Sequence, residues 1–144
     1  MKQKLTNQDI AYLVTSLNEL LDGSYLVQIY DGSEKDTRTL IFKLRKKLND
    51  ESNVYYLLFE SGKRVHTIDE FVSIRKNPSG CVSKLRKELG KRRLFPINQI
   101  GNDRIIDLQF SNDRHLILEL YDKGNIILTD ENYNILFITR VYEN

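Results

Sequence analysis

Short apolar segments separated by polar turns follow one another through the last third of the chain, and few folds accommodate such a series. Apolar residues dominate 105–110, 115–121, 125–129 and 135–141, and the turns between them are rich in Asn and Asp. Strands of this length joined by short polar turns pair with their neighbours in antiparallel hairpins. The series therefore predicts a meander that belongs to an antiparallel sandwich or barrel.

The first half of the chain predicts further strands at 25–30, 39–45, 54–60 and 65–67. Within 39–45, apolar Leu40, Phe42 and Leu44 alternate with charged residues, so we expect one face to be buried and the other to be wet and basic. The pair Asp31-Gly32 is typical of a hairpin turn, and 46–53 is predicted to be a polar loop. Residues 68–77 are ambiguous between a loop and a short turn of helix.

Two helices are predicted, at 7–21 and at 80–89. The first has an apolar stripe at helical spacing, Thr6 as a plausible N-cap with Asp9 three residues on, and Gly23 at its end. The second opens after Pro78-Ser79 and closes at Gly90. The fold class expected for residues 1–144 is therefore α+β: one domain in which two helices accompany a mostly antiparallel β-sandwich.

The composition narrows the classes of function. A single cysteine, Cys81, excludes an internal disulfide, and with only two histidines we expect neither a metal site nor a cofactor. No apolar run approaches the ~18 residues that a membrane span needs, and no apolar stretch follows Lys2 and Lys4 as in a secretory signal. The expectation is a soluble cytoplasmic protein.

The net charge of +2 hides an uneven distribution. Residues 60–104 carry 11 basic and 5 acidic side chains, and residues 105–144 carry 3 basic and 7 acidic. Six cations fall within ten residues of the basic block: Lys84, Arg86, Lys87, Lys91, Arg92 and Arg93. Helical geometry would line Lys84, Lys87 and Lys91 along one face, which suits an RNA backbone. The alternative is a solvated helix face.

Several stretches, in their order and spacing, resemble the N-terminal portion of the NFACT family. They are TNQDI at 6–10, ESGKRVHT at 60–67, LRKEL at 85–89, RRL at 92–94, QIGNDRI at 99–105 and LELYDKGNIILTD at 118–130. Two departures lie in the second helix, where Cys81 replaces a usual aromatic residue and Ser83 a usual apolar one. Proteins of the family are much longer, so the chain is expected to be a piece of such a protein or a reduced stand-alone version.

The resemblance implies a fold similar to the N-terminal domain of formamidopyrimidine-DNA glycosylases. It implies a non-catalytic quality-control factor that binds tRNA and rRNA on a stalled large ribosomal subunit and supports C-terminal tailing of the nascent chain. It also implies recruitment of an E3 ubiquitin ligase of the Listerin type, partly through domains that follow in the family. Asp103 and Arg104, with Asp9, are implied to recognise tRNA. The alternatives are a turn salt bridge or strand-start cap for the pair, and a helix-start charge for Asp9.

Other classes of function are less well supported by the sequence. A glycosylase of the similar fold attacks with an N-terminal proline followed by glutamate, and Met1-Lys2-Gln3 supplies neither. A protein-interaction scaffold could dock through the acidic meander after residue 105. Nothing in the chain argues for the adhesin role attached to some bacterial members of the family.

Overall fold

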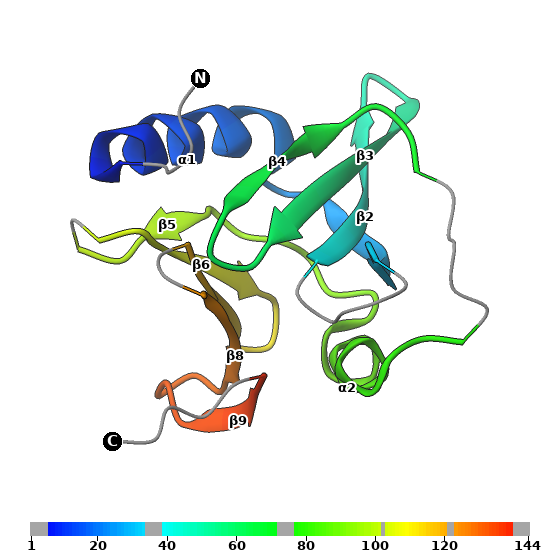
Figure 1. The fold of residues 1–144 in the computed structure, drawn as a ribbon. Helices are drawn as coiled ribbons and strands as arrows, with labels where there is room; N and C mark the ends of the chain where they lie inside the picture. Colours follow the sequence, from blue (N-terminus) through cyan, green and yellow to red (C-terminus); the bar gives the residue numbers. More distant parts are fainter. Residues whose placement is uncertain (1–5, 34–38, 72–76, 102, 121–122, 140–144) are drawn as a thin grey trace, which may run out of the picture.

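A computed structural model of the chain describes residues 6–33, 39–71, 77–101, 103–120 and 123–139. Within these residues the chain forms two helices and two antiparallel sheets (Figure 1). Side chains from both helices and both sheets share one hydrophobic core. The predicted α+β class, with two helices and antiparallel strands, is confirmed.

The first helix, α1 (Asn7–Leu21), has the bounds that the sequence predicts. The Thr6 hydroxyl accepts a hydrogen bond from the Asp9 N–H at 3.1 Å, and the Asp9 carboxylate accepts one from the Thr6 N–H at 2.8 Å. These two reciprocal hydrogen bonds satisfy two backbone N–H groups that have no acceptor within the helix. Gly23 follows the helix in the left-handed region, with φ +84°, where glycine is favoured. The buried stripe consists of Ile10, Val14, Leu17 and Leu21.

The first sheet has the strand order β1-β2-β3-β4. Its strands are β1 (Tyr25–Asp31), β2 (Thr39–Leu48), β3 (Glu51–Glu60) and β4 (Arg64–Ile68). On β2, Leu40, Phe42 and Leu44 are buried as predicted, but Ile41 on the opposite face is buried too. The solvent-exposed, basic part of the opposite face of β2 therefore begins beyond Ile41.

The polar loop predicted for residues 46–53 is wrong, because these residues are the arms of a long hairpin between β2 and β3. Leu48 pairs with Glu51, so only Asn49 and Asp50 form the turn. Both have positive φ, 51° and 66°, as two-residue hairpin turns require. The arms reach past the hydrophobic core, which explains why their sequence is polar.

The Asp31-Gly32 pair does not form a two-residue hairpin turn. Asp31 is the last residue of β1 and is buried, and its carboxylate accepts a hydrogen bond from the Ser79 N–H at 2.8 Å. β1 and β2 pair as antiparallel neighbours across a longer connection, of which 34–38 lie outside the described residues. Of the ambiguous stretch 68–77, Ile68 ends β4 and 72–76 also lie outside them.

The second helix, α2 (Gly80–Leu89), again has its predicted bounds, and it packs against β1. The Ser79 hydroxyl accepts a hydrogen bond from the Val82 N–H at 3.2 Å and caps the helix. Cys81 is buried among its apolar neighbours, and burial, reinforced by the charge of Asp31, raises the pKa of the thiol to about 11. Ser83 faces solvent, so both departures from the family pattern fit the packing of this helix.

The second sheet has the order β5-β6-β7-β8-β9. Its strands are β5 (Asn98–Gln99), β6 (Ile105–Phe110), β7 (Arg114–Glu119), β8 (Asn125–Thr129) and β9 (Ile135–Ile138). The predicted meander is confirmed, although β7 begins one residue earlier and ends earlier than predicted, and β9 ends at Ile138. Residues 121–122 and 140–144 lie outside the described residues, and the two-residue strand β5 was not predicted.

Residues 91–95, which we call the bridging segment, are hydrogen-bonded to both sheets. On the side of β1, the Leu94 N–H donates to the Ser24 carbonyl at 2.7 Å. On the side of β6, the Phe95 N–H donates to the Gln109 carbonyl at 2.8 Å. The segment thus joins the two sheets. α1 lies beside β5, and α2 lies on the other side of the molecule (Figure 1). Neither described helix is long and apolar enough to cross a bilayer.

Candidate nucleic-acid interface

Two of the six predicted cations are tied into the fold. Arg86 donates from Nε to the Ile29 carbonyl at 2.8 Å, and its guanidinium lies 5.6 Å from the centre of the Tyr30 ring. Arg92 donates from Nε to the Glu88 carbonyl and from Nη1 to the Ser111 carbonyl, both at 2.7 Å. These guanidinium groups hold α2 against β1 and against the turn that follows β6.

The other cations of the block face solvent to different degrees. The Lys84 side chain is 39% exposed, and its ammonium lies 3.4 Å from the Glu88 carboxylate. Lys87 is exposed and has no ion-pair partner among the described residues. Arg93 is exposed and lies over the ring of Tyr25, 6.0 Å from its centre. Lys84 and Lys87 therefore present positive charge on the surface of α2.

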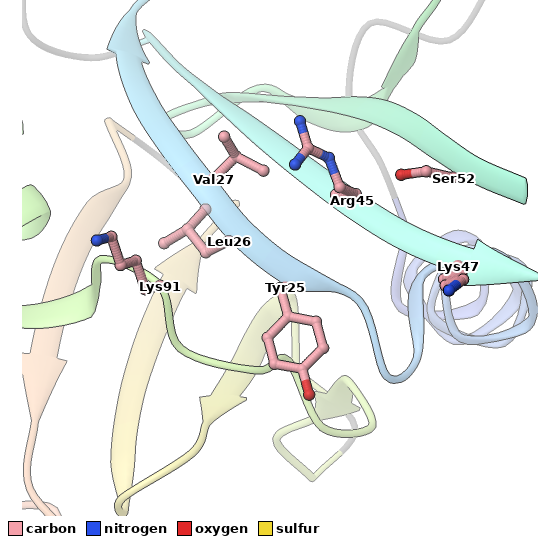
Figure 2. A pocket seen from close by; sticks show the side chains of 7 residues that line it. All are labelled: Tyr25, Leu26, Val27, Arg45, Lys47, Ser52 and Lys91. Atoms are coloured by element: carbon pink, nitrogen blue, oxygen red, sulfur yellow. The ribbon is translucent and has the colours of Figure 1, made fainter. Parts of the chain in front are cut away.

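Lys91 does not continue the helical line, so the prediction that Lys84, Lys87 and Lys91 share one helix face is wrong for its last member. The helix ends at Leu89, and Lys91 adopts the left-handed region with φ 66°. Its N–H donates to the Leu26 carbonyl of β1 at 3.1 Å. This turn carries the Lys91 side chain to a groove that Tyr25 of β1 also lines (Figure 2).

Asp103 and Arg104 lie in the loop between β5 and β6. The Asp103 carboxylate accepts a hydrogen bond from the Arg104 N–H at 2.8 Å, so it caps the start of β6. The Gln99 amide nitrogen donates to the Asp103 carbonyl at 2.7 Å and to the Asn7 carbonyl at 3.2 Å. Gln99 therefore joins this loop to the first turn of α1, which carries Asp9.

A small hollow lies at this corner, lined by Asn7, Gln8, Ala11 and Gln99. Asp9 itself has the capping role in α1 described above. The three residues implied in tRNA recognition thus lie at one end of the molecule, and two of them also cap secondary structure. The hydrogen bond from Gln99 to Asn7 joins residues 92 positions apart in the sequence, so no local pattern predicts that Gln99 lies at this corner.

The acidic last third is not a continuous acidic surface in the described residues. Asp107 is 4% exposed, and its carboxylate lies 3.0 Å from Nδ1 of buried His115. The Tyr133 hydroxyl donates to the same carboxylate at 2.8 Å, which raises the pKa of Tyr133. Glu119 is also buried. Two of the carboxylates that would form an acidic docking face, those of Asp107 and Glu119, are therefore buried.

Asp130 is engaged within the chain as well. Its carboxylate accepts hydrogen bonds from the N–H groups of Asn134 and Asn132 at 3.0 and 2.9 Å, and the bonds to Asn134 contribute most to lowering the pKa of this carboxyl. In the part of the chain that the structure describes, no three His, Cys, Asp or Glu side chains form a group that could hold a metal ion.

A comparison with family profiles and a comparison with known sequences point to the same family. A family profile described as NFACT N-terminal and middle domains matches residues 6–143. The chain is 40% identical over 143 residues to ribosome quality control complex subunit NEMF of Homo sapiens, and 34% identical over 142 residues to ribosome quality control complex subunit 2 of Saccharomyces cerevisiae. These alignments cover 97% and 98% of this chain but 13% of each relative, so the chain spans a small part of their length.

Solved structures support the fold. The N-terminal domain of the fibronectin-binding protein PavA from Streptococcus pneumoniae superposes with a TM-score of 0.80 at 23% identity, over 96% of this chain and 54% of that one. The fibrinogen binding protein from Staphylococcus aureus gives 0.75 at 23% identity, over 96% and 51%. Because the family profile covers nearly all of the sequence, the chain belongs to the NFACT family, in the region of its N-terminal and middle domains.

Proposed function

We propose that this chain is a non-catalytic RNA-binding module of a ribosome quality control factor. It would bind tRNA and rRNA on stalled large ribosomal subunits and so support C-terminal tailing of the nascent chain. Relatives named as ribosome quality control complex subunits support an association with the ribosome. The observation that carries the proposal is the exposed positive charge on and after α2, where Glu88 is the sole carboxylate of residues 80–93.

Phosphate binding by this surface has a clear physical basis. Each phosphate that a lysine or arginine neutralises releases counterions, so binding is favourable at low salt and weakens steeply as salt is added. Lys87 and Arg93 are exposed for such contacts, and the Lys84 ammonium is shared with Glu88. Arg86 and Arg92 keep α2 in position while their positive charge adds to the local field.

A test separates phosphate binding from general surface charge. In Lys84→Gln/Lys87→Gln, tRNA and large-subunit affinity should fall, and the slope of log K against log salt should decrease by about 1 to 2. The control Lys63→Gln/Lys123→Gln removes two exposed cations from turns elsewhere. If both variants keep the slope of the unchanged protein, the α2 surface is a solvated helix face and the proposal fails.

We further propose that Asp103 and Arg104, with Asp9, discriminate among tRNAs. An arginine can hold a base or phosphate with two hydrogen bonds, and a carboxylate can accept from a base amino group. Arg104→Lys keeps the charge but loses the bidentate geometry, and Asp103→Asn keeps an oxygen that can cap the Arg104 N–H.

These two variants should retain the melting temperature and lose about 1–3 kcal/mol of discrimination between tRNAs. Large-subunit binding should change less, because the cations of α2 remain. A variant that melts early yet keeps its tRNA preference would assign the pair to the turn alone.

A further inference from the structure

The outer face of the first sheet carries a row of exposed side chains, of which the proposed function uses only Arg93. Strand register places Arg45 of β2 opposite Val54 of β3 on one side and opposite Tyr25 of β1 on the other. Tyr25 in turn pairs with Arg93 of the bridging segment. Opposed residues of an antiparallel ladder project to the same face, and all four are exposed.

A groove of about 540 Å³ includes Tyr25 and Arg45 of this row, and Figure 2 shows the side chains that line it. We call it the β1–β2 groove and define it by Tyr25, Arg45, Lys47 and Lys91. No acidic residue is among the residues that line it. Lys47 lies two residues beyond Arg45 on the same face of β2, and Lys91 reaches the groove from the turn after α2.

The three cations of the groove have no carboxylate partner among the described residues. Arg45, Lys47 and Lys91 are all exposed, whereas the neighbouring Lys46 donates to the Leu20 carbonyl and Lys84 pairs with Glu88. Like charges held close together repel each other, and a polyanion in the groove would relieve this repulsion. The charge of the groove therefore complements a chain of phosphates.

Tyr25 adds a second kind of contact. Tyr25 is 54% exposed, and the guanidinium of Arg93 lies 6.0 Å from the centre of its ring. Aromatic rings beside cations form the platforms on which unpaired bases stack. Same-face positions on one strand, such as Arg45 and Lys47, lie about 7 Å apart. That spacing is comparable to the distance between successive phosphates of an extended strand.

We propose that the β1–β2 groove binds an unpaired RNA segment, with a base stacked on Tyr25 and phosphates held by Arg45, Lys47 and Lys91. The proposal rests on the proposed RNA-binding function and adds a second contact surface, separate from the α2 cations. An acidic peptide would match the positive charge alone, but it would gain nothing from stacking on the tyrosine ring.

The first arm of the test measures binding of a fluorescent oligouridine of about 12 nucleotides by anisotropy over a salt series. Arg45→Gln/Lys47→Gln/Lys91→Gln should reduce the salt slope by about 2, since each single-strand contact contributes about 0.7. The control Lys63→Gln/Arg64→Gln/Lys123→Gln removes the same charge elsewhere and should leave the slope unchanged.

The second arm tests stacking. Tyr25→Ala should weaken oligouridine binding about five-fold or more, Tyr25→Phe should retain it, and neither should alter binding of an abasic oligonucleotide of the same length. Melting temperatures show that each variant is folded. Equal loss for the abasic strand, or polyglutamate binding that competes fully and ignores Tyr25, would overturn the proposal in favour of a charge-only site.

The outcomes also distinguish the two proposals. If the groove variant binds oligouridine normally while Lys84→Gln/Lys87→Gln impairs tRNA binding, the groove proposal fails and the proposed function stands. If the unchanged protein binds no RNA at low salt, both fail together.

Discussion

Replacing Arg92 by alanine should destabilise the fold far more than replacing any exposed cation near it. The guanidinium makes two hydrogen bonds of 2.7 Å, one to the last turn of α2 and one to the Ser111 carbonyl across the bridging segment. Hydrogen bonds to a charged group contribute about 1.5–3 kcal/mol each, and water can reach this half-buried site in the variant. We therefore expect Arg92→Ala to cost about 2–4 kcal/mol, or roughly 5–15 °C in melting temperature.

Urea unfolding followed by circular dichroism gives the free energy directly. Lys87→Ala is the matched control, because it removes an exposed cation from the same helix and should change stability by less than about 0.5 kcal/mol. Arg92→Lys keeps the charge, but a single ammonium cannot reproduce the two-pronged geometry, so more than half of the loss should remain. If Arg92→Ala unfolds at the same urea concentration as the unchanged protein, Arg92 is a surface cation and the contacts described for it contribute nothing.

The remaining predictions concern other contacts. Because the pKa of Cys81 rises from 9.0 to about 11 on folding, the unfolded chain ionises first, and the unfolding free energy should fall by up to about 3 kcal/mol between pH 9 and 11. Cys81→Ala should lack that part of the pH dependence. Gly124→Ala would press a methyl group into the turn between β3 and β4 at φ +74°, costing about 3 kcal/mol or more, whereas Gly80→Ala meets open space and should be neutral or slightly stabilising in thermal melts. Asn18→Ala removes two hydrogen bonds to the Ile97 backbone, of 2.7 and 2.6 Å, and should cost about 2 kcal/mol by urea titration.

The helices could be predicted to the residue because their signals are local. Thr6 and Ser79 are N-caps that sit directly before apolar stripes of helical period, so both the start and the buried face follow from neighbouring residues. The arms of the β2–β3 hairpin could not be predicted, because strand residues beyond the core need no apolar side chains. These residues are extended because each arm pairs with the other. The register of that pairing depends on both strands, so the sequence pattern of one strand does not predict it.

The sequence predicts where the positive charge of the candidate site is concentrated, but it does not predict how the charged side chains are arranged. The sequence locates the six cations, but what each one contacts depends on distant backbone groups. Arg86 meets the carbonyl of Ile29, 57 residues earlier, and Arg92 meets that of Ser111, 19 residues later. Lys91 itself adopts the left-handed region after the end of α2, so extending the helical spacing beyond Leu89 gives the wrong position for its side chain.

The bridging segment belongs to no regular strand, yet every one of its amide hydrogens is hydrogen-bonded. Those of 91, 94 and 95 go to carbonyls of Leu26, Ser24 and Gln109, that of 92 goes back to α2, and that of 93 goes to the Ser111 hydroxyl. Hydrogen exchange there requires the contacts to both sheets to open. We expect this irregular stretch to exchange as slowly as the central strands. Damage to either sheet should therefore lower the protection of the other, so that the domain unfolds as one cooperative unit.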